Sequence, residues 1–238
     1  MASTVIKNWD NKTWLSSQNY IKLFNNFLIK NIKLNSDSKI LDIGCGRGKI
    51  LGALSSKLKL KNKPIGIDII DHKDKDKRII FKKIEAIKYF KRNNKNFDLI
   101  LIKQTIHLLK FKEIKKLLAN CSRKLNPDGK IIIFTLETTQ NEIPTFLLMK
   151  KKLLKSLERD KKILKFILNL YPNNIVKRFS FNVKISKKKY LEMIKNRYIS
   201  TLLGFNLKQI FKGINEFNSK YKDQLSFSDK LICIILKN

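Results

Sequence analysis

Five short apolar runs before Thr138 alternate with amphipathic or polar stretches, and this alternation restricts the fold more than any other feature of the chain. The runs are Lys39–Ile43, Pro64–Ile69, Arg78–Ile84, Phe97–Lys103 and Lys130–Glu137. Helical patterns occupy Lys49–Lys59, Glu85–Arg92 and Phe111–Lys124, which the sequence NPDG stops, whereas Asp71–Arg78 is too polar and too short for a packed helix. Strands alternating with helices predict a doubly wound α/β sheet of mostly parallel strands. Right-handed crossovers then bring the carboxyl ends of these strands to one edge, where ligands bind.

The pattern changes after Glu137, where the chain becomes more helical. Thr13–Ile32 predicts a helix before the first strand, and Ile143–Pro172 predicts a long cationic helix or helix pair after the fifth. The apolar stripe of that second helix consists of Leu147, Met149, Leu153, Leu154, Leu157, Leu164, Ile167 and Leu168. The remaining expected elements are a strand at Val176–Ser186, helices at Lys188–Leu203 and Asn206–Tyr221, and a last strand at Lys230–Lys237.

The net charge is the outlying feature of the composition. Lys and Arg number 52 against 19 Asp and Glu, which gives +33, while 43% hydrophobic residues indicate a folded chain. A bias toward AT-rich codons enriches Lys, Asn, Ile and Phe, but it enriches Glu as well and so does not explain the whole imbalance. Such a field attracts polyanions, anionic lipids or acidic small molecules. The lysines are spread along the whole chain and form no dense basic block.

The apolar runs and the cysteines of the sequence indicate where in the cell the protein is expected. No run approaches the roughly 20 apolar residues of a membrane-spanning helix, and the first residues lack the apolar core of a signal peptide. Cys45, Cys121 and Cys233 lie far apart, with neither a disulfide framework nor metal-ligand spacing. We therefore expect no metal site and a reducing, cytoplasmic location.

The turn between the first strand and the first following helix carries the most specific motif, Asp42-Ile-Gly44-Cys-Gly46-Arg-Gly48. Glycines permit a tight turn and the close approach of a ligand to the main chain. The dinucleotide pattern G-x-G-x-x-G is not met, because Lys49 occupies the position of its third glycine. An acid beneath the turn disfavours a phosphate and suits a positively charged group, such as an ammonium or a sulfonium.

Two further strand ends extend this pattern. Asp68 closes the second strand about 20 residues after the last glycine, where doubly wound folds place an acid on ribose hydroxyls. Glu85 and Ala86 follow the third strand, where an adenine edge would lie. An amino-acid end, a ribose and an adenine in this order describe S-adenosylmethionine.

The stretch of residues 36–137 resembles the Rossmann-like, class I S-adenosylmethionine-dependent methyltransferases, in particular the small-molecule branch that includes trans-aconitate methyltransferase. The matching pieces are ILDIGCGRG, GIDI, EA, FDLILIKQTIHLL and LNPDGKIIIF. The resemblance implies a seven-stranded sheet in a single domain, 1–238. Its parts are an N-terminal helical lid (1–35), a cofactor-binding core (36–137), a helical cap with the sixth strand (138–227) and the last strand (228–238).

The resemblance also implies which residues contact the cofactor. They are Asp42, Gly44, Cys45, Gly46 and Gly48 at the methionine end, Asp68 and Ile69 at the ribose, Glu85 and Ala86 at the adenine, and Lys103 and Gln104 beside the methyl group. The alternatives are that Asp42 and Asp68 only cap turns, that Cys45 only packs, and that Glu85 only favours a helix N-terminus. The helix expected after the second strand is replaced by Asp71–Arg78, which leaves one wall of the adenine pocket undefined.

Methyl transfer from a sulfonium is an in-line displacement, so alignment supplies most of the catalysis. A base is needed only if the acceptor must lose a proton. His107, just after the fourth strand, is the first candidate base or substrate-positioning residue, and a packed histidine is the alternative. Glu137, at the end of the fifth strand, is the second candidate.

The segments outside the core should select the acceptor. Trp9, Trp14 and Tyr20 would close the site or form an aromatic cage, unless they pack in the core. Arg197 and Tyr198 stand in apolar surroundings, and an arginine fork there suits an acidic acceptor. The alternative pairs Arg197 with a neighbouring acid.

The favoured function is thus methyl transfer to a small molecule. An RNA methyltransferase is the alternative that the charge suggests, although neither an RNA-binding module nor an NPPY-type motif is found. Other readings are a membrane-surface protein that uses Lys150–Lys165 as an interfacial helix, and a cofactor-binding protein without activity. The oligomeric state does not follow from the sequence.

Overall fold

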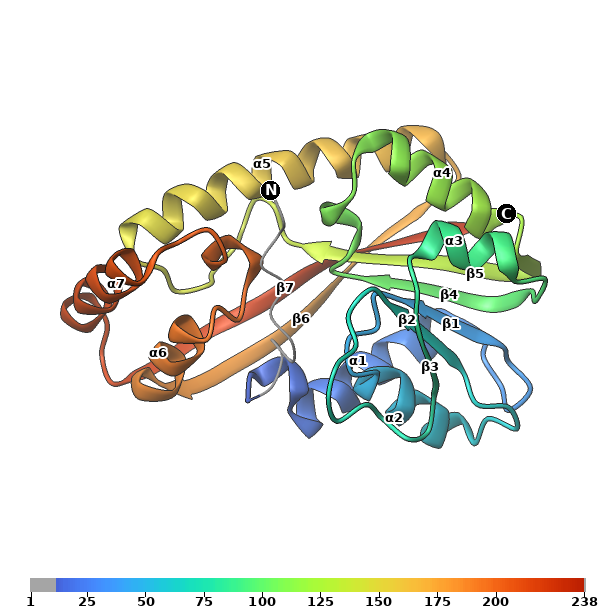
Figure 1. Ribbon diagram of the computed structural model, residues 1–238, viewed down its shortest axis with the longest axis horizontal. Helices are drawn as coiled ribbons and strands as arrows, with labels where there is room; N and C mark the ends of the chain where they lie inside the picture. Colours follow the sequence, from blue (N-terminus) through green and yellow to red (C-terminus); the bar gives the residue numbers. More distant parts are fainter. Residues whose placement is uncertain (1–11, 238) are drawn as a thin grey trace.

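A single mixed sheet organises the computed structural model, which describes residues 12–237 (Figure 1). The seven strands lie in the order β3-β2-β1-β4-β5-β7-β6. Their bounds are β1 Ile40–Ile43, β2 Ile65–Asp68, β3 Ile80–Lys83, β4 Phe97–Lys103, β5 Leu125–Leu136, β6 Ile175–Ser186 and β7 Gln224–Lys237. Strands β1 to β5 pair in parallel, while β7 is antiparallel to both β5 and β6. The predicted doubly wound, mostly parallel seven-stranded fold is confirmed.

The strand order reverses between β1 and β4, and this reversal places the site. Ile43 at the end of β1 is in register with Ile67 of β2 on one side and with Ile102 of β4 on the other. The carboxyl ends of the three strands therefore meet at one edge. A doubly wound sheet binds its ligand at such a switch point.

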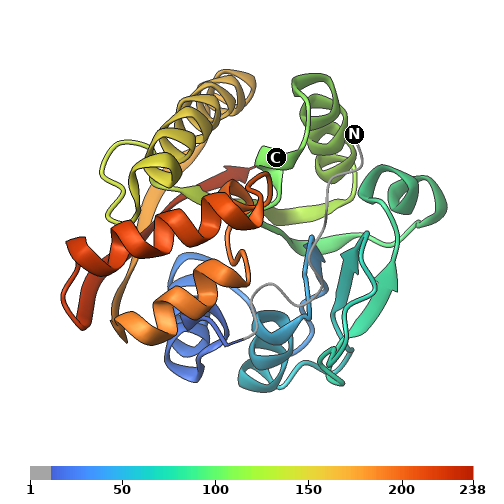
Figure 2. The ribbon, with the colours of Figure 1, turned by 60° about the vertical axis from the view of Figure 1, so that its left-hand side comes forward.

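Helices cover both faces of the sheet, as Figures 1 and 2 show. They are α1 Gln18–Asn31, α2 Lys49–Leu58, α3 Ala86–Arg92, α4 Phe111–Ser122, α5 Leu147–Leu170, α6 Lys187–Lys195 and α7 Leu207–Lys220, with the 3₁₀ turns η1 Trp14–Ser16, η2 Ile106–Leu108 and η3 Ser200–Leu202. One apolar cluster joins the sheet to α1, α2, α6, α7 and the first half of α5. The other joins it to α3, α4 and the second half of α5.

The helix before the first strand starts later than the prediction of Thr13. The Ser17 side chain accepts the Tyr20 N–H and begins α1 at Gln18, after the separate turn η1. Along α1, the side chains of Tyr20, Phe24 and Leu28 are fully buried. This helix is thus part of the layer that covers the sheet, and a role of residues 1–35 as a lid stays a prediction.

The fifth strand starts earlier than predicted, because the NPDG sequence lies inside β5. Between Phe97 and Leu99 of β4 the register with β5 shifts from Leu125 to Lys130, so the turn residues form an irregular bulge. Asn126 Nδ2 donates to Asp98 Oδ1 over 2.6 Å and ties this bulge to β4. The predicted loop at Asp71–Arg78 contains no helix, as expected.

Two predictions about the cap need correction. Leu147 and Leu154 are 57% and 53% exposed, since the buried face of the single helix α5 follows Met149, Leu153, Leu157, Asp160, Ile163 and Ile167 instead. The helix predicted over Lys188–Leu203 ends at Lys195, because Arg197 takes a left-handed φ of 51°. Within residues 12–237, no helix combines the length and apolar character that crossing a bilayer requires.

Candidate active site

The glycine turn after β1 is fastened to the end of β2 by main-chain hydrogen bonds. Gly44 N and Cys45 N both donate to Ile67 O, at 2.8 and 3.1 Å. Gly46 N donates to Asp68 Oδ2 over 2.9 Å, and Ile70 N donates to Asp68 Oδ1 over the same distance. The Asp68 carboxylate therefore shapes the turn in addition to ending the strand, which is the turn-capping role considered from the sequence.

Two glycines of the turn are required for different reasons. Gly44 has a φ of +74°, and a Cβ there would lie 2.1 Å from Thr105 Oγ1, so tight packing excludes a side chain. Gly46 has a φ of +56°, but a Cβ there would meet nothing within 4 Å. The backbone at Gly46 is thus an open cradle that a ligand can approach.

Asp42 lies beneath this turn with its side chain buried, and its Oδ1 atom has no hydrogen-bond partner. Burial raises the pKa of Asp42 to about 7, with a further increase from the negative charge of Asp68 and an opposing effect of Lys103. An orphaned buried carboxyl group is uncommon because it is costly. A positive ligand near Asp42 would compensate for this cost and favour its ionised form.

Lys103, the last residue of β4, joins Asp42 to a second buried acid. Its Nζ lies 5.4 Å from the ring centroid of Tyr20 and donates to Gln104 Oε1 over 3.1 Å. Its positive charge acts on Asp42 and also on Asp229 of β7. Burial raises the pKa of Asp229, and Trp14 Nε1, which donates to its Oδ2 over 2.8 Å, opposes this increase.

Asp229 was not predicted from the sequence. The only signal for it was an isolated acid at the start of the apolar final strand, in SDKLICIILK. Lys103 thus acts on both Asp42 and Asp229, and Asp68 acts on Asp42, so electrostatic interactions link three acids to one lysine within a chain of net charge +33. We call these four residues the acidic cluster. Its acidic groups outnumber its one ammonium, so a cationic ligand along the open backbone of the turn would favour their ionised forms.

The residues predicted at the ribose and adenine ends lie in sequence along the same edge. Ile69 follows Asp68 with 60% of its side chain exposed, which leaves an apolar surface beside the ribose position. Glu85 is the N-cap of α3, where its carboxylate accepts the Ile87 and Lys88 N–H groups at 2.7 and 3.1 Å. This capping role is the alternative considered for Glu85, and contacts of Glu85 and Ala86 with an adenine stay a prediction.

Cys45 of the turn has mainly a packing role. The Cys45 Sγ atom lies 2.7 Å from where Gly66 would carry a Cβ, and burial raises the pKa of the Cys45 thiol far above its usual range. A protonated, packed thiol is a poor nucleophile.

His72 was not predicted from the sequence. It is buried in the loop after β2, with Nε2 3.8 Å from Asp68 Oδ2.

The two candidate bases differ in their surroundings. His107 lies in η2, next to the end of β4, where burial and the positive charge of Arg159 lower its pKa to about 4. It is therefore neutral at pH 7 and able to accept a hydrogen bond or a proton.

Glu137 is buried at the end of β5 and accepts hydrogen bonds from Thr138 N, Thr139 N, Thr139 Oγ1 and Arg178 Nε. Burial raises its pKa, but these donors outweigh burial and lower it overall. A carboxylate that is fully used as an acceptor and held ionised is a structural group, which argues against Glu137 as the base.

The aromatic residues predicted to face the acceptor pack together. Trp14 and Tyr198 are buried, with ring centroids 5.4 Å apart, and Tyr198 Oη lies 2.7 Å from Tyr190 Oη. Tyr20 is also fully buried, so the core-packing alternative describes all three positions. Trp9 lies outside the described residues.

Arg197 is held by the turn in which it lies. Its guanidinium donates through Nη2 to Phe205 O over 2.9 Å, while its buried Nε has no hydrogen-bond partner. The described residues form no ion pair between Arg197 and an acid. The structure thus assigns Arg197 a role in closing the turn after α6, and a contact with an acceptor stays a prediction.

Comparisons with known proteins agree with this geometry. Residues 40–129 match the family described as "Methyltransferase domain". No curated protein matches the chain in sequence. A solved structure of a putative methyltransferase from an antibiotic biosynthesis pathway of Anabaena variabilis has a TM-score of 0.62 and 16% identity, over 90% of this chain and 96% of that chain.

Two further structures share the fold. The plantazolicin methyltransferase BpumL, in complex with SAH, has a TM-score of 0.54 and 20% identity, over 97% of this chain and 88% of that chain. A SAM-dependent methyltransferase from Archaeoglobus fulgidus has a TM-score of 0.51 and 22% identity, over 92% of this chain and 94% of that chain. At these identities the likeness is one of fold.

The domain match and the site together define the class of protein. Residues 40–129 form a class I, Rossmann-like methyltransferase domain. The enzyme class and cofactor predicted from the motifs are confirmed for residues 40–129, which are an S-adenosylmethionine-dependent methyltransferase domain.

Proposed function

We propose that this enzyme transfers the methyl group to a small-molecule acceptor that lies beside the ends of β4 and β5. The acidic cluster carries the proposal, because it forms a local cation site within a strongly basic protein. Support for a small acceptor comes from the motif resemblance and from the fold shared with the plantazolicin methyltransferase BpumL, which was solved in complex with a monoazolic desmethylPZN analog and SAH.

Each residue has a distinct part in binding. Asp42 and the open backbone at Gly46 would hold the methionine end, and Asp68 the ribose. Lys103 keeps Asp42 partly ionised and, through Gln104, forms the floor beside the methyl group. When bound, the cofactor supplies an electrophilic methyl group on a positively charged sulfur.

The transfer step needs little further chemistry. Bound S-adenosylmethionine would supply a methyl carbon whose bond to sulfur is replaced by a bond to the acceptor atom, with the electron pair left on sulfur. An acceptor that carries a proton gives it to neutral His107 or to water. With a pKa of about 4, His107 is a weak base. Its main contribution is to accept a hydrogen bond from the acceptor, which turns the acceptor's proton away from the lone pair that attacks the methyl group.

An acidic acceptor stays the alternative, because the Arg197 guanidinium uses only its Nη2 in the hydrogen bond to Phe205 O. We propose a neutral acceptor, because the carboxylates outnumber the ammonium of Lys103. Incubation with labelled cofactor and metabolite extract, followed by acid precipitation, tests the class of acceptor. Label in an acid-soluble product that chromatography separates from the cofactor supports a small molecule, whereas label transferred only to precipitated RNA refutes it.

Matched variants separate the cofactor claim from the acceptor claim. Asp42→Asn should weaken the binding of S-adenosylhomocysteine in calorimetry, whereas Asp37→Asn at the exposed loop before β1 should not. Arg197→Ala should leave KM unchanged for a neutral acceptor, and a raised KM for an acidic one would restore the acidic hypothesis.

A further inference from the structure

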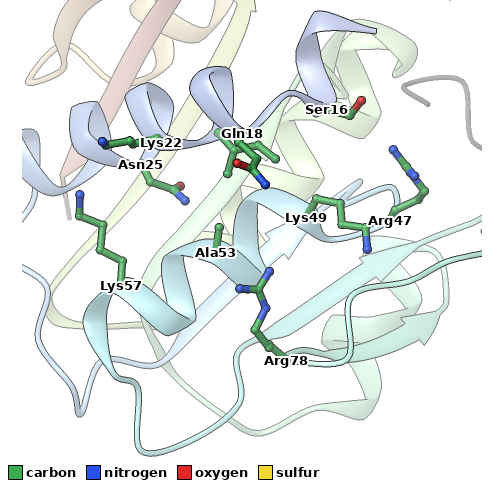
Figure 3. Close-up of a pocket in the computed structure, with 10 residues that line it drawn as sticks. Ser16, Gln18, Lys22, Asn25, Arg47, Lys49, Ala53, Lys57 and Arg78 are labelled. Atoms are coloured by element: carbon green, nitrogen blue, oxygen red, sulfur yellow. The ribbon is translucent and has the colours of Figure 1, made fainter. Parts of the chain in front are cut away.

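A groove between α1 and α2 opens beside the glycine turn and is lined by basic side chains (Figure 3). Its volume is about 540 Å³. The cations are Lys22 of α1, Arg47 of the turn, Lys49 and Lys57 of α2, and Arg78 of the loop before β3. None of the side chains that line this cavity is a carboxylate. We call these five residues the basic groove.

The cations reach the groove from separate elements and converge on it. Lys49 and Lys57 are eight residues apart on α2, which places them on the same helix face two turns from each other. Figure 3 shows Lys22 across from Lys57 at one end, with Lys49 and Arg78 toward the other. Helix α2 also begins at Lys49, so its positive end adds to the charge there.

Only part of this charge is compensated within the protein. Arg78 pairs with Asp76 over 2.7 Å, and Asp76 also feels the charge of Lys49. Lys57 donates to the neutral side chain of Asn26. Across residues 12–237, no ion pair within 4.0 Å involves Lys22, Lys49 or Lys57. Like charges facing one cavity repel each other, and an anion between them would remove this repulsion.

We propose that the basic groove binds a small ligand with two or more phosphate charges, such as a pyrophosphate group. Cations at both ends of the groove suit a ligand with more than one anionic centre, and lysines bind phosphates as point charges. The volume falls in the range of about 300–1,000 Å³ that is typical of small-molecule sites. The charge of the groove is opposite to that of the acidic cluster, so the two sites suit different ligands.

Calorimetry with inorganic pyrophosphate on the full chain, at an ionic strength of about 0.15 M, tests the proposal. The groove variant is Lys22→Gln/Lys49→Gln/Lys57→Gln. Its matched control is Lys161→Gln/Lys162→Gln/Lys165→Gln, which removes the same charge from exposed positions on α5. We expect the groove variant to raise the Kd about tenfold or more and the control to change it by less than about twofold.

One further measurement and one replacement variant complete the test. Saturating S-adenosylhomocysteine should leave the pyrophosphate Kd unchanged. If the triple variant melts abnormally, Lys22→Gln/Lys57→Gln, at two exposed positions, replaces it and should raise the Kd about threefold or more.

Three results would overturn the proposal. Equal losses in the groove and control variants would indicate a general charge effect. Competition with S-adenosylhomocysteine would assign the lysines to the cofactor pocket. Groove-dependent binding of single-stranded RNA without binding of pyrophosphate would make the groove a nucleic-acid surface.

Discussion

Replacing Asp42 by Asn should stabilise the cofactor-free protein and weaken cofactor binding at the same time. The Asp42 carboxyl is buried, its Oδ1 is unpaired, and its pKa is about 7 when folded. In the unfolded chain an aspartate has a pKa of about 3.9, so the folded state binds the proton more tightly. Stability from this group is therefore greatest at low pH and is lost as the pH rises from about 4 to 7.

The size of the effect follows from this displacement of the pKa. With these two pKa values, ionising Asp42 reduces the free energy of unfolding by about 1.5 kcal/mol at pH 5 and about 4 kcal/mol at pH 8. The Asn variant lacks this dependence. The difference in unfolding free energy between Asp42→Asn and the original chain should thus grow by about 2.5 kcal/mol from pH 5 to pH 8. Any constant cost of an unpaired amide cancels between the two conditions.

Urea unfolding of the cofactor-free variant and the original chain at pH 5 and at pH 8 measures how the difference in their unfolding free energies changes with pH. Asp37→Asn is the matched control. The hydrogen bond from Lys61 lowers the pKa of Asp37, so this exposed carboxylate is ionised in the folded and the unfolded chain at both pH 5 and pH 8. The difference in unfolding free energy between Asp37→Asn and the original chain should therefore be the same at the two pH values. If the Asp42→Asn difference is also constant, Asp42 does not titrate in this window and the reasoning fails. Undiminished binding of S-adenosylhomocysteine by Asp42→Asn would remove Asp42 from the cofactor site.

Further predictions concern the turn and the candidate bases. Gly46→Ala should fold with a loss of about 1–2 kcal/mol from its left-handed φ and should weaken cofactor binding, whereas Gly44→Ala should fail to fold, since its methyl group would meet a side chain at 2.1 Å. Thermal melts and calorimetry check both. For an acceptor that loses a proton, His107→Asn should lower kcat by about tenfold, the effect of one lost orienting hydrogen bond, while Glu137→Gln should lower Tm and leave kcat nearly unchanged. The reverse pattern in steady-state kinetics would make Glu137 the base.

The sequence was most informative for site residues that lie at neighbouring strand ends and in the turn between them. Asp42, the glycines and Asp68 occupy a strand end, the turn after it and the adjacent strand end, so the alternation of strands and helices was enough to bring them together. Lys103 was expected from the family resemblance alone, and its place near Asp42 agrees with β4 lying directly beside β1. The neighbourhood of the glycine turn and Asp68 could be predicted with no tertiary information beyond the handedness of the crossovers, while the cofactor contacts of these residues stay a prediction.

The acceptor half depends on contacts that are remote in the chain. The hydrogen bond from Trp14 to Asp229 joins residues 215 positions apart, and it forms only because β7 inserts beside β5. Arg197 was predicted on a helix, but a left-handed residue is hard to foresee when it is not glycine. The sequence identified which residue types could act there. It did not identify the partner each would find.

The acidic cluster also has a consequence for turnover, because the cofactor loses its sulfonium charge when the methyl group leaves. The neutral sulfur of the product is attracted less strongly to Asp42 and Asp229 than the sulfonium is. We expect S-adenosylmethionine to bind more tightly than S-adenosylhomocysteine at pH 8, and this preference to shrink at pH 6, where Asp42 is mostly protonated. Calorimetry with both ligands at the two pH values measures the ratio. A ratio that is independent of pH would show that Asp42 does not sense the sulfonium, and the basis for charge-driven product release would be gone.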